Sequence, residues 1–321
     1  MKLLVTGGCG FIGSHFVHLA LQKDPDVEIV NLDKLTYAGR LENVSDLKGN
    51  ARYKFVKGDI LDRELVKRLA KETDEIVHFA AETHVDRSIM QAGEFAMTDV
   101  LGTQALLEAA LGAGHERFFH ISTDEVYGSR KEGFFKEEDA MQPNSPYSAS
   151  KAGAEMMVRA YEKTYGLKAS VTRSSNNYGP NQHPEKFIPR AITNLIRGKK
   201  VPIYGNGKNV RDWLFVLDNC EAIYMLLKGK HDGVYNVGAR GGEENVKIAR
   251  DILGIMGKGE ECLEYVEDRK GHDWRYAIDT GKINALGWKP KVKLEEGLKR
   301  TAEWYLVNAQ WWAPLVDDYG N

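Results

Sequence analysis

Cysteine is scarce in this chain of 321 residues, which has only Cys9, Cys220 and Cys262. The three are odd in number and far apart, and none has a His or Cys neighbour at the spacing of a metal site. This pattern argues against a disulfide-stapled scaffold and against a structural zinc module. We expect three reduced cysteines that serve packing, and no metal.

An excess of charge of one sign is also lacking, because 44 Lys and Arg stand against 46 Asp and Glu, for a formal net charge of -2. Electrostatics therefore give no support to a nucleic-acid partner or to an anionic membrane surface. No apolar run approaches the length of a membrane span, and the one at residues 1–6 ends in glycines too early for a signal peptide. We expect a cytoplasmic protein.

The first half of the chain alternates short, β-rich apolar runs with stretches of helical periodicity. Strands are predicted at residues 2–6, 27–33, 53–56, 75–80, 117–122 and 169–173, and helices at 11–22, 63–71, 95–111 and 147–165. This alternation is typical of a parallel sheet that helices cover on both faces. We predict an α/β fold, a Rossmann-type doubly wound parallel sheet with a smaller C-terminal α/β lobe.

The pattern loosens after about Gly179, where turn-rich segments separate short helices and strands. We assign residues 1–178 to a cofactor-binding domain that carries the catalytic residues. Residues 179–321 form mainly a substrate lobe, with some segments returning to the core. The aromatic tail with Trp304, Trp311 and Trp312 is interpreted as a helix end packed on the core rather than as a ligand site.

A glycine-rich loop, residues 7–13, lies between the first predicted strand and the first predicted helix. Gly7, Gly10 and Gly13 permit a tight turn and close approach of a pyrophosphate to the helix N-terminus. Asp33 follows about 20 residues later at the end of the next strand, where its carboxylate accepts from a ribose hydroxyl and repels a 2′-phosphate. The sequence therefore predicts NAD rather than NADP. Further contacts are expected at the ends of the third and fourth strands, from Asp59, Ile60, Phe79, Ala80 and Ala81.

Two groups of polar residues suggest catalysis. Tyr147 and Lys151 lie four residues apart on one helix face, where the ammonium is expected to lower the pKa of the phenol toward that of a general base. Thr123, Asp124 and Glu125 follow the fifth strand at the edge of the sheet, beside the expected nicotinamide. The alternative to catalysis is a structural role, in which Asp124 caps the following turn and Glu125 faces water. A carboxylic acid beside a carboxylate is equipped to supply one proton while removing another.

With these residues the chain resembles the extended short-chain dehydrogenase/reductase family, and within it the dTDP-glucose 4,6-dehydratases. The resemblance covers nearly the whole chain. It is carried by residues 32–39 (LDKLTYAG), 80–88 (AAETHVDRS), 122–128 (STDEVYG), 175–180 (SNNYGP), 209–213 (NVRDW) and 271–277 (GHDWRYA). The Asp124-Glu125 pair is its most specific part, since related epimerases and decarboxylases carry other residues there.

The resemblance implies a mechanism. Tyr147, assisted by Lys151 and Thr123, takes the proton of the hexose 4-hydroxyl as NAD accepts the C4 hydride. Glu125 then removes the C5 proton while Asp124 protonates the departing C6 hydroxyl, and the hydride returns to C6. The product is a 4-keto-6-deoxy sugar, formed from dTDP-glucose without net redox.

The resemblance also implies binding residues and a homodimer formed by helices 95–111 and 147–165. To the cofactor contacts it adds Phe11, Ile12, Lys34, Leu35, Thr36, Thr83, Thr98, Tyr147, Lys151 and Asn177. For the nucleotide sugar it implies Thr83, His84, Thr123, Asp124, Glu125, Asn176, Lys186, Pro202, Tyr204, Arg211, Asn245, Arg269 and His272. Arg211 suits bidentate phosphate contact, and Tyr204 offers a face to a pyrimidine.

Four residues depart from the family pattern: Asp99 stands in place of an expected Asn, and Asn181, His183 and Lys270 also differ. We expect them near substrate or packing positions and away from the proton-transfer residues. The alternatives to a dTDP-glucose 4,6-dehydratase are a UDP-glucose 4,6-dehydratase, a nucleotide-sugar 4-epimerase and a catalytically silent NAD-binding protein. The epimerase needs no acid-base pair to expel water, and a silent protein usually loses the tyrosine or the lysine.

Overall fold

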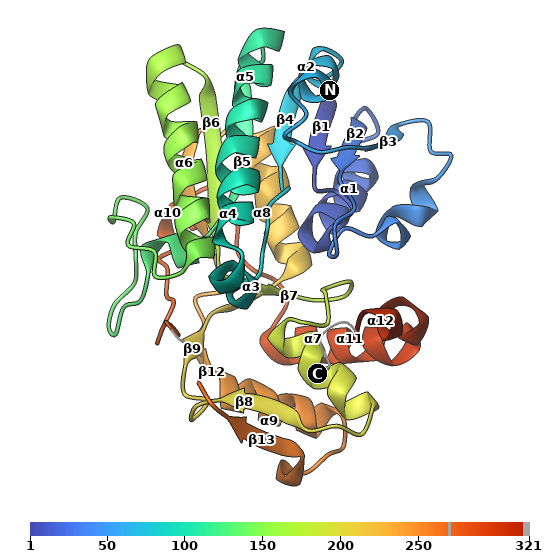
Figure 1. Ribbon diagram of the computed structural model, residues 1–321, viewed down its shortest axis with the longest axis vertical. Coiled ribbons are helices and arrows are strands. Elements are labelled where there is room, and N and C mark those ends of the chain that lie inside the picture. The colour runs from blue at the N-terminus through green and yellow to red at the C-terminus, as the bar shows by residue number, and fades with distance from the viewer. Residues whose placement is uncertain (269–270, 317–321) are drawn as a thin grey trace.

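A seven-stranded parallel sheet forms the upper part of the molecule in Figure 1. The computed structural model describes residues 1–268 and 271–316. The strand order is β11-β6-β5-β4-β1-β2-β3, and every neighbouring pair is parallel. The strands are β1 (Lys2–Thr6), β2 (Glu28–Asp33), β3 (Tyr53–Lys57), β4 (Glu75–His78), β5 (Arg117–Thr123), β6 (Lys168–Ser174) and β11 (Gly233–Val237). The predicted Rossmann-type sheet is confirmed, with all six predicted strands in it.

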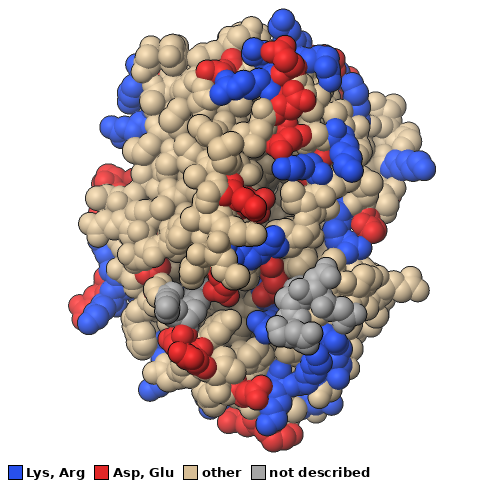
Figure 2. Space-filling model, in the orientation of Figure 1, with Lys and Arg blue, Asp and Glu red and all other residues tan. Residues whose placement is uncertain are grey.

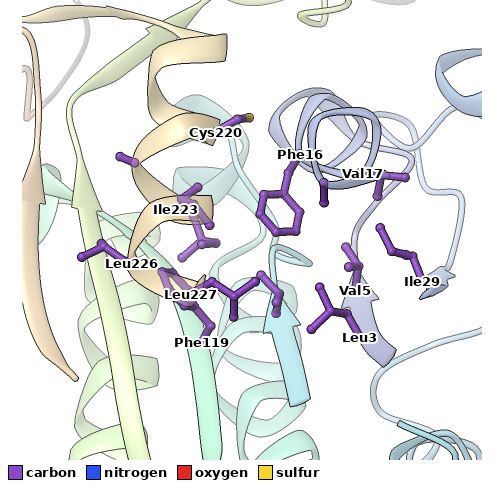
Figure 3. Packing of buried hydrophobic residues seen from close by; sticks show 14 of the residues in the cluster. Leu3, Val5, Phe16, Val17, Ile29, Phe119, Cys220, Ile223, Leu226 and Leu227 are labelled. Carbon is purple, nitrogen blue, oxygen red and sulfur yellow. The ribbon is translucent and has the colours of Figure 1, made fainter. Parts of the chain in front are cut away.

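Helices cover both faces of this sheet. One face carries α1 (Phe11–Lys23) and α8 (Val216–Lys228). Figure 3 shows Phe16 of α1 and Ile223 of α8 meeting above Leu3 and Val5 of β1. The other face carries α2 (Arg63–Lys71), α5 (Thr103–Ala113) and α6 (Pro146–Tyr165). Burial of both faces explains why the strands read as continuous apolar runs.

The helix predicted at residues 95–111 is interrupted in the structure. It consists of α4 (Ala92–Phe95), a π-helical segment η2 (Ala96–Gly102) and α5. Near its end the Thr103 hydroxyl donates to the carbonyl of Asp99 at 2.5 Å. A π-helical segment of this kind often marks a functional position in a helix.

Part of the second half of the chain returns to the sheet. β11 pairs with β6, and α8 packs on α1. Neither element was predicted individually. β11 begins at a glycine of positive φ, and its place in the sheet depends on pairing with a strand some 60 residues earlier.

The remaining elements build the lower lobe in Figure 1 and the connections to it. Its core is formed by α7 (Phe187–Ile196), α9 (Asn245–Ile255), α11 (Leu294–Val307), α12 (Ala309–Val316) and the parallel pair β8 (Val201–Tyr204) and β13 (Leu263–Val266). The connections contain β7 (Asn176–Tyr178), β9 (Val210–Arg211), β10 (Trp213–Phe215) and β12 (Glu243–Glu244), and η4 (Glu260–Cys262) lies between α9 and β13. In the upper part, η1 (Leu41–Leu47) packs on α1 and α10 (Gly281–Ala285) on β11, and α3 (Val85–Met90) and η3 (Asp124–Tyr127) follow β4 and β5.

The aromatic tail is part of the lower lobe's core, as predicted. Trp312 is 3% exposed, and Trp304 and Trp311 pack beside it. The three cysteines are free, with Cys9 and Cys220 buried. In the part of the chain that the structure describes, no helix has the length and apolar character of a membrane span. On the face in Figure 2, basic and acidic side chains are interspersed rather than gathered by sign.

Candidate active site

The glycine loop after β1 forms a narrow backbone cradle. Gly7 has a φ of 73°, and a Cβ there would lie 2.6 Å from the backbone nitrogen of Ala80. A Cβ on Gly13 would lie 2.3 Å from the carbonyl oxygen of Gly7. Gly10 begins α1 without a side-chain cap, which leaves the helix N-terminus to a ligand phosphate. A side chain at Gly7 or Gly13 would collide with the backbone of Ala80 or of Gly7, so the glycines let the loop pack this closely at the N-terminus of α1, as the pyrophosphate of a dinucleotide requires.

Asp33 lies at the carboxyl end of β2, where the sequence places the ribose contact. Its Oδ2 accepts from the backbone N–H of Cys9 at 2.9 Å, and its Oδ1 accepts from that of Leu35 at 2.8 Å. Burial raises the pKa of Asp33, and the two N–H donors act in the opposite direction. The carboxylate is therefore fixed in orientation, and its remaining lone pairs are available to ribose hydroxyls.

The predicted cofactor residues line one cavity of about 310 Å³, with one exception. Its walls include Gly7, Gly10, Phe11, Ile12, Gly13, Asp33, Lys34, Thr36, Asp59, Ile60, Phe79, Ala80, Ala81, Thr83, Thr98, Tyr147, Lys151 and Asn177. Leu35 is the exception, since its side chain packs against the apolar core between α1 and the sheet. The backbone N–H of Leu35 donates to Asp33, and a contact of Leu35 with the cofactor stays a prediction.

Thr123, Asp124 and Glu125 lie where β5 passes into η3, and all three line this cavity. The Thr123 hydroxyl caps η3 by accepting from the backbone N–H of Glu125 at 3.2 Å. Asp124 is therefore not the cap. It is 2% exposed, and its Oδ2 has no hydrogen-bond partner among the described residues.

The two acidic neighbours have different surroundings. Burial raises the pKa of Asp124 well above its usual range, and the negative charges of Glu125 and Asp212 add to this effect. This direction favours the protonated form of Asp124, which is the form that can give a proton. Glu125 is half-buried and lies within 3.4 Å of the Tyr276 hydroxyl.

Tyr147 and Lys151 lie in the first turns of α6. A capping box between Ser145 and Ser148, with Pro146 at the first helical position, fixes where this helix begins. Lys151 is buried, and its Nζ donates to the carbonyl of Ile121 in β5 at 2.7 Å. The helix therefore holds both side chains against the carboxyl end of the sheet.

The expected lowering of the Tyr147 pKa is not found. Burial raises the pKa of this phenol, the negative charges of Glu125 and Asp99 raise it further, and hydrogen bonds with Thr83 and Thr123 act in the opposite direction. Desolvation outweighs the lysine that the sequence brings near. The phenol is thus neutral in the structure and needs further positive charge in the site to act as a base.

Asp99 corrects a second expectation. The residues that depart from the family pattern were placed away from the proton-transfer groups, but Asp99 accepts from the Ser150 hydroxyl at 2.5 Å, beside Lys151. Its charge acts on both Tyr147 and Lys151. Among the other departures, Asn181 bonds to Asn43 and His183 lines the cofactor cavity, whereas Lys270 lies outside the described residues.

The predicted substrate residues lie at the lower lobe's side of the same cleft. Thr83, Thr123 and Asp124 line the first cavity. A second cavity of about 180 Å³ is lined by His84, Glu125, Asn176, Lys186, Pro202, Tyr204, Arg211, Asn245 and His272. Glu125, Asn176 and Lys186 belong to both walls, so the two cavities meet beside the acidic pair. Arg269 lies outside the described residues.

Tyr276 is a wall residue to which the sequence assigned no role. It lines the second cavity, donates to Asp273 Oδ2 at 2.7 Å and carries the guanidinium of Arg211 at 4.2 Å from its ring centroid. The segment 271–277 contained it, but its contact with Glu125 joins residues 151 positions apart. Glu185, which bonds to Tyr37 at 2.9 Å, was missed for the same reason.

Fold and site together define a dinucleotide-binding enzyme of the Rossmann-type α/β class. A family model described as GDP-mannose 4,6 dehydratase matches residues 4–301, and the chain belongs to this family. A dTDP-glucose 4,6-dehydratase of Streptomyces niveus is 49% identical over 323 residues, which cover 98% of this chain and 96% of the relative.

Two solved structures are similar to the chain over nearly its whole length. DesIV of Streptomyces venezuelae, a dTDP-glucose 4,6-dehydratase with NAD and TYD bound, is 48% identical, with a TM-score of 0.96 and coverage of 98% of this chain and 100% of that one. A UDP-glucose 4-epimerase of Thermotoga maritima, with UDP-glucose, is 32% identical, with a TM-score of 0.88 and coverage of 95% and 99%.

Proposed function

We propose that this protein converts dTDP-glucose to dTDP-4-keto-6-deoxyglucose and water, as an NAD-dependent hydro-lyase without net redox. The observation that carries the proposal is the acidic pair: a buried, neutral Asp124 beside Glu125, where the two cavities meet. An epimerase has no use for an acid that expels water. Two relatives of similar length, 49% and 48% identical in sequence to this chain, are dTDP-glucose 4,6-dehydratases, and this supports the same reaction here.

The cofactor is NAD, and the cradle around Gly7, Gly10 and Gly13 with Asp33 at its far end fits it. When bound, it supplies the hydride acceptor at C4 of the hexose and the hydride donor at C6. Tyr147 and Lys151 reach the same cavity from α6. We assign adenosine recognition to Asp33 and the pyrophosphate to the glycine loop.

Tyr147 is assigned as the base that accepts the proton of the 4-hydroxyl. Its hydroxyl is held by Thr83 and Thr123, which favour the ionised form. Lys151, fixed on the carbonyl of Ile121, keeps its ammonium on the same helix face. Loss of the 4-hydroxyl proton together with the C4 hydride, which the bound cofactor would accept, gives a ketone at C4, and this acidifies the hydrogen at C5.

Glu125 is assigned as the base at C5 and Asp124 as the acid at the C6 hydroxyl. A raised pKa keeps the proton on Asp124 until the hydroxyl departs. The Tyr276 hydroxyl lies 3.4 Å from Glu125 Oε2, while its one proton is donated to Asp273 Oδ2 at 2.7 Å. One proton leaves carbon while another reaches oxygen, and the sum is elimination of water.

We further propose the two-domain organisation predicted from the sequence. Residues 1–178 bind NAD and carry the catalytic groups, and residues 179–321 mainly bind the nucleotide sugar. The side chains of Arg211 and Lys186 suit the diphosphate, and Tyr204 suits the pyrimidine. The mixed surface charge and free cysteines support a cytoplasmic location.

A homodimer is part of the proposal. Large apolar side chains are exposed together on α3, η2 and α6, at Ile89, Met90, Met97, Leu101 and Met156. Met90 is 85% exposed. Apolar groups gathered on helices that contact one another are what a helix-to-helix interface buries.

Turnover of two nucleotide sugars tests the function. The NAD-loaded protein is mixed with dTDP-glucose or UDP-glucose, and the keto sugar is followed by its near-ultraviolet absorbance in alkali. We expect product from dTDP-glucose at the higher kcat/KM. A higher kcat/KM with UDP-glucose would contradict the thymine assignment, a 4-epimer would indicate an epimerase, and no conversion of either would indicate a silent protein.

A further inference from the structure

Asp99 is a buried carboxylate for which the proposed reaction has no use. It is 1% exposed and lies in the π-helical segment η2. Oδ1 accepts from the backbone N–H of Glu82 at 2.9 Å, and Oδ2 accepts from the Ser150 hydroxyl at 2.5 Å. Within residues 1–268 and 271–316, no Lys or Arg forms an ion pair with it at contact distance. A buried anion with neutral donors alone is costly and calls for a compensating charge nearby.

Lys151 is that charge. Its ammonium is buried and bonded to a neutral carbonyl, and among the described residues no carboxylate forms an ion pair with it. Two anions act on it, Asp99 and Glu155. Glu155 is already neutralised by Arg173, whose Nε and Nη2 lie 3.0 and 2.7 Å from its Oε2. Asp99 is therefore the anion whose charge is left to balance Lys151.

We propose that Asp99 is the counter-charge of Lys151 and a positioning residue that sets the pH range in which Tyr147 and Lys151 work. It acts through Ser150, which it holds in the turn of α6 between the two. It also fixes the backbone of Glu82, next to Thr83 at the Tyr147 hydroxyl. The inference rests on the proposed function, since it takes Tyr147 as the catalytic base.

The sign of the effect follows from the neighbours. Burial lowers the pKa of Lys151, and the negative charge of Asp99 opposes this because it favours the ammonium. Burial raises the pKa of Tyr147, and the charge of Asp99 adds to this because it disfavours the phenolate. Burial raises the pKa of Asp99 itself to about 6, so the charge is present above that pH.

The other titratable groups around this set are Glu82 beside Asp99, Glu125 facing Tyr147, and Glu155, His78 and His120 near Lys151. Burial lowers the pKa of both histidines, so they carry no charge in the working range. Replacement of Asp99 leaves these other residues in place. A shift of the pH profile in such a variant therefore reports the loss of the Asp99 charge.

Replacement of the carboxylate by the isosteric amide tests this. Asp99→Asn keeps the shape and the bond from Glu82 and is the residue expected from the family pattern. We expect both limbs of the pH profile of kcat/KM for dTDP-glucose to move to lower pH by about one unit, the lower range for a nearby charge. The matched control is Asp218→Asn, which removes a buried carboxylate that accepts two backbone N–H groups outside both cavities. Both limbs of the pH profile of this control should lie where they do in wild type.

A titration without turnover separates this inference from the proposed function. The ultraviolet absorbance of tyrosinate is followed with pH in wild type and in Asp99→Asn, each against the same protein with Tyr147→Phe. We expect the Tyr147 component at lower pH in the Asp99→Asn protein. The inference would be overturned if Asp99→Asn lowered kcat/KM without moving the limbs of its pH profile. It would also be overturned if the Tyr147 titration were the same in the variant and in wild type. If the variant showed the titration shift but wild type did not turn over dTDP-glucose, the proposed function would be rejected and the inference about Asp99 would stand.

Discussion

The hydroxyl of Tyr276 lies 3.4 Å from Oε2 of Glu125, in the wall that the two halves of the cleft share. Burial raises the pKa of Tyr276, and its one hydroxyl proton is donated to Asp273 Oδ2 at 2.7 Å, so the phenol oxygen is a polar neighbour of Glu125 and not the donor to it. Burial raises the pKa of the adjoining Asp124, whose Oδ2 has no hydrogen-bond partner among the described residues. Two adjacent acidic residues are therefore differentiated by their surroundings, one toward a base and the other toward an acid.

Glu125→Gln should lower turnover of dTDP-glucose by about two to four powers of ten, because removal of the C5 proton loses its base. Oxidation at C4 does not use Glu125. Reduced cofactor should then accumulate on the enzyme when substrate is added, and its absorbance in stopped flow measures this.

Asp124→Asn should act later, on the departure of the C6 hydroxyl, because the amide has no acidic proton to give. We expect product formation to fall by about two to four powers of ten. Retention of the fold is checked by thermal unfolding. If both variants lost the reduced-cofactor signal and the product equally, these residues would be structural.

Tyr147→Phe should reduce turnover by about two to four powers of ten while NAD stays bound, because the phenol acts in proton transfer and the cavity is otherwise unchanged. The measurement is the rate together with the cofactor content of the purified protein. A near-native rate in the variant would remove Tyr147 from the assignment.

The local parts of this site were predictable from the sequence. The glycine loop and the capped start of α6 each depend on residues within a few positions of one another, and Asp33 follows the loop at the spacing of a strand–helix–strand unit. The parallel sheet followed from apolar runs at regular spacing. These are patterns that a single chain displays without knowledge of its tertiary contacts.

The nonlocal parts were not predictable. The Tyr147 pKa was misjudged because the sequence shows the neighbouring lysine and not the burial. The position of Asp99 depends on an interruption of the helix at η2 that no residue pattern signalled. Leu35 has a φ of 57° and turns toward the core, so the run that contains Asp33 does not face the cavity throughout.

Asp33→Asn should weaken NAD binding about tenfold to a hundredfold, the scale of a charge-assisted hydrogen bond of about 1.5–3 kcal/mol. The advantage of NAD over NADP should narrow, because the carboxylate that repels a 2′-phosphate is gone. Since the cofactor is regenerated in place, stripped protein must be refilled with each dinucleotide in a binding titration. If stripped wild type took up NADP as readily as NAD, the interpretation of Asp33 would be wrong.

Leu101→Glu with Met156→Glu should convert a dimer to monomers, because two charges would have to be buried in the apolar interface. Sedimentation velocity at micromolar concentration measures this. Leu306→Glu, at an exposed apolar position on α11 in the lower lobe, is the control and should leave the dimer intact. A wild-type protein that is only monomeric would refute the proposed assembly.

The fate of the hydrogen at C4 tests the dehydratase account most directly. The NAD-loaded protein is given dTDP-glucose that carries deuterium at C4, and the product is analysed by mass spectrometry and NMR. The account predicts a product lighter by one water, with the deuterium at C6. A product of unchanged mass with deuterium retained at C4, or a dehydrated product whose deuterium has been lost to solvent, would contradict it.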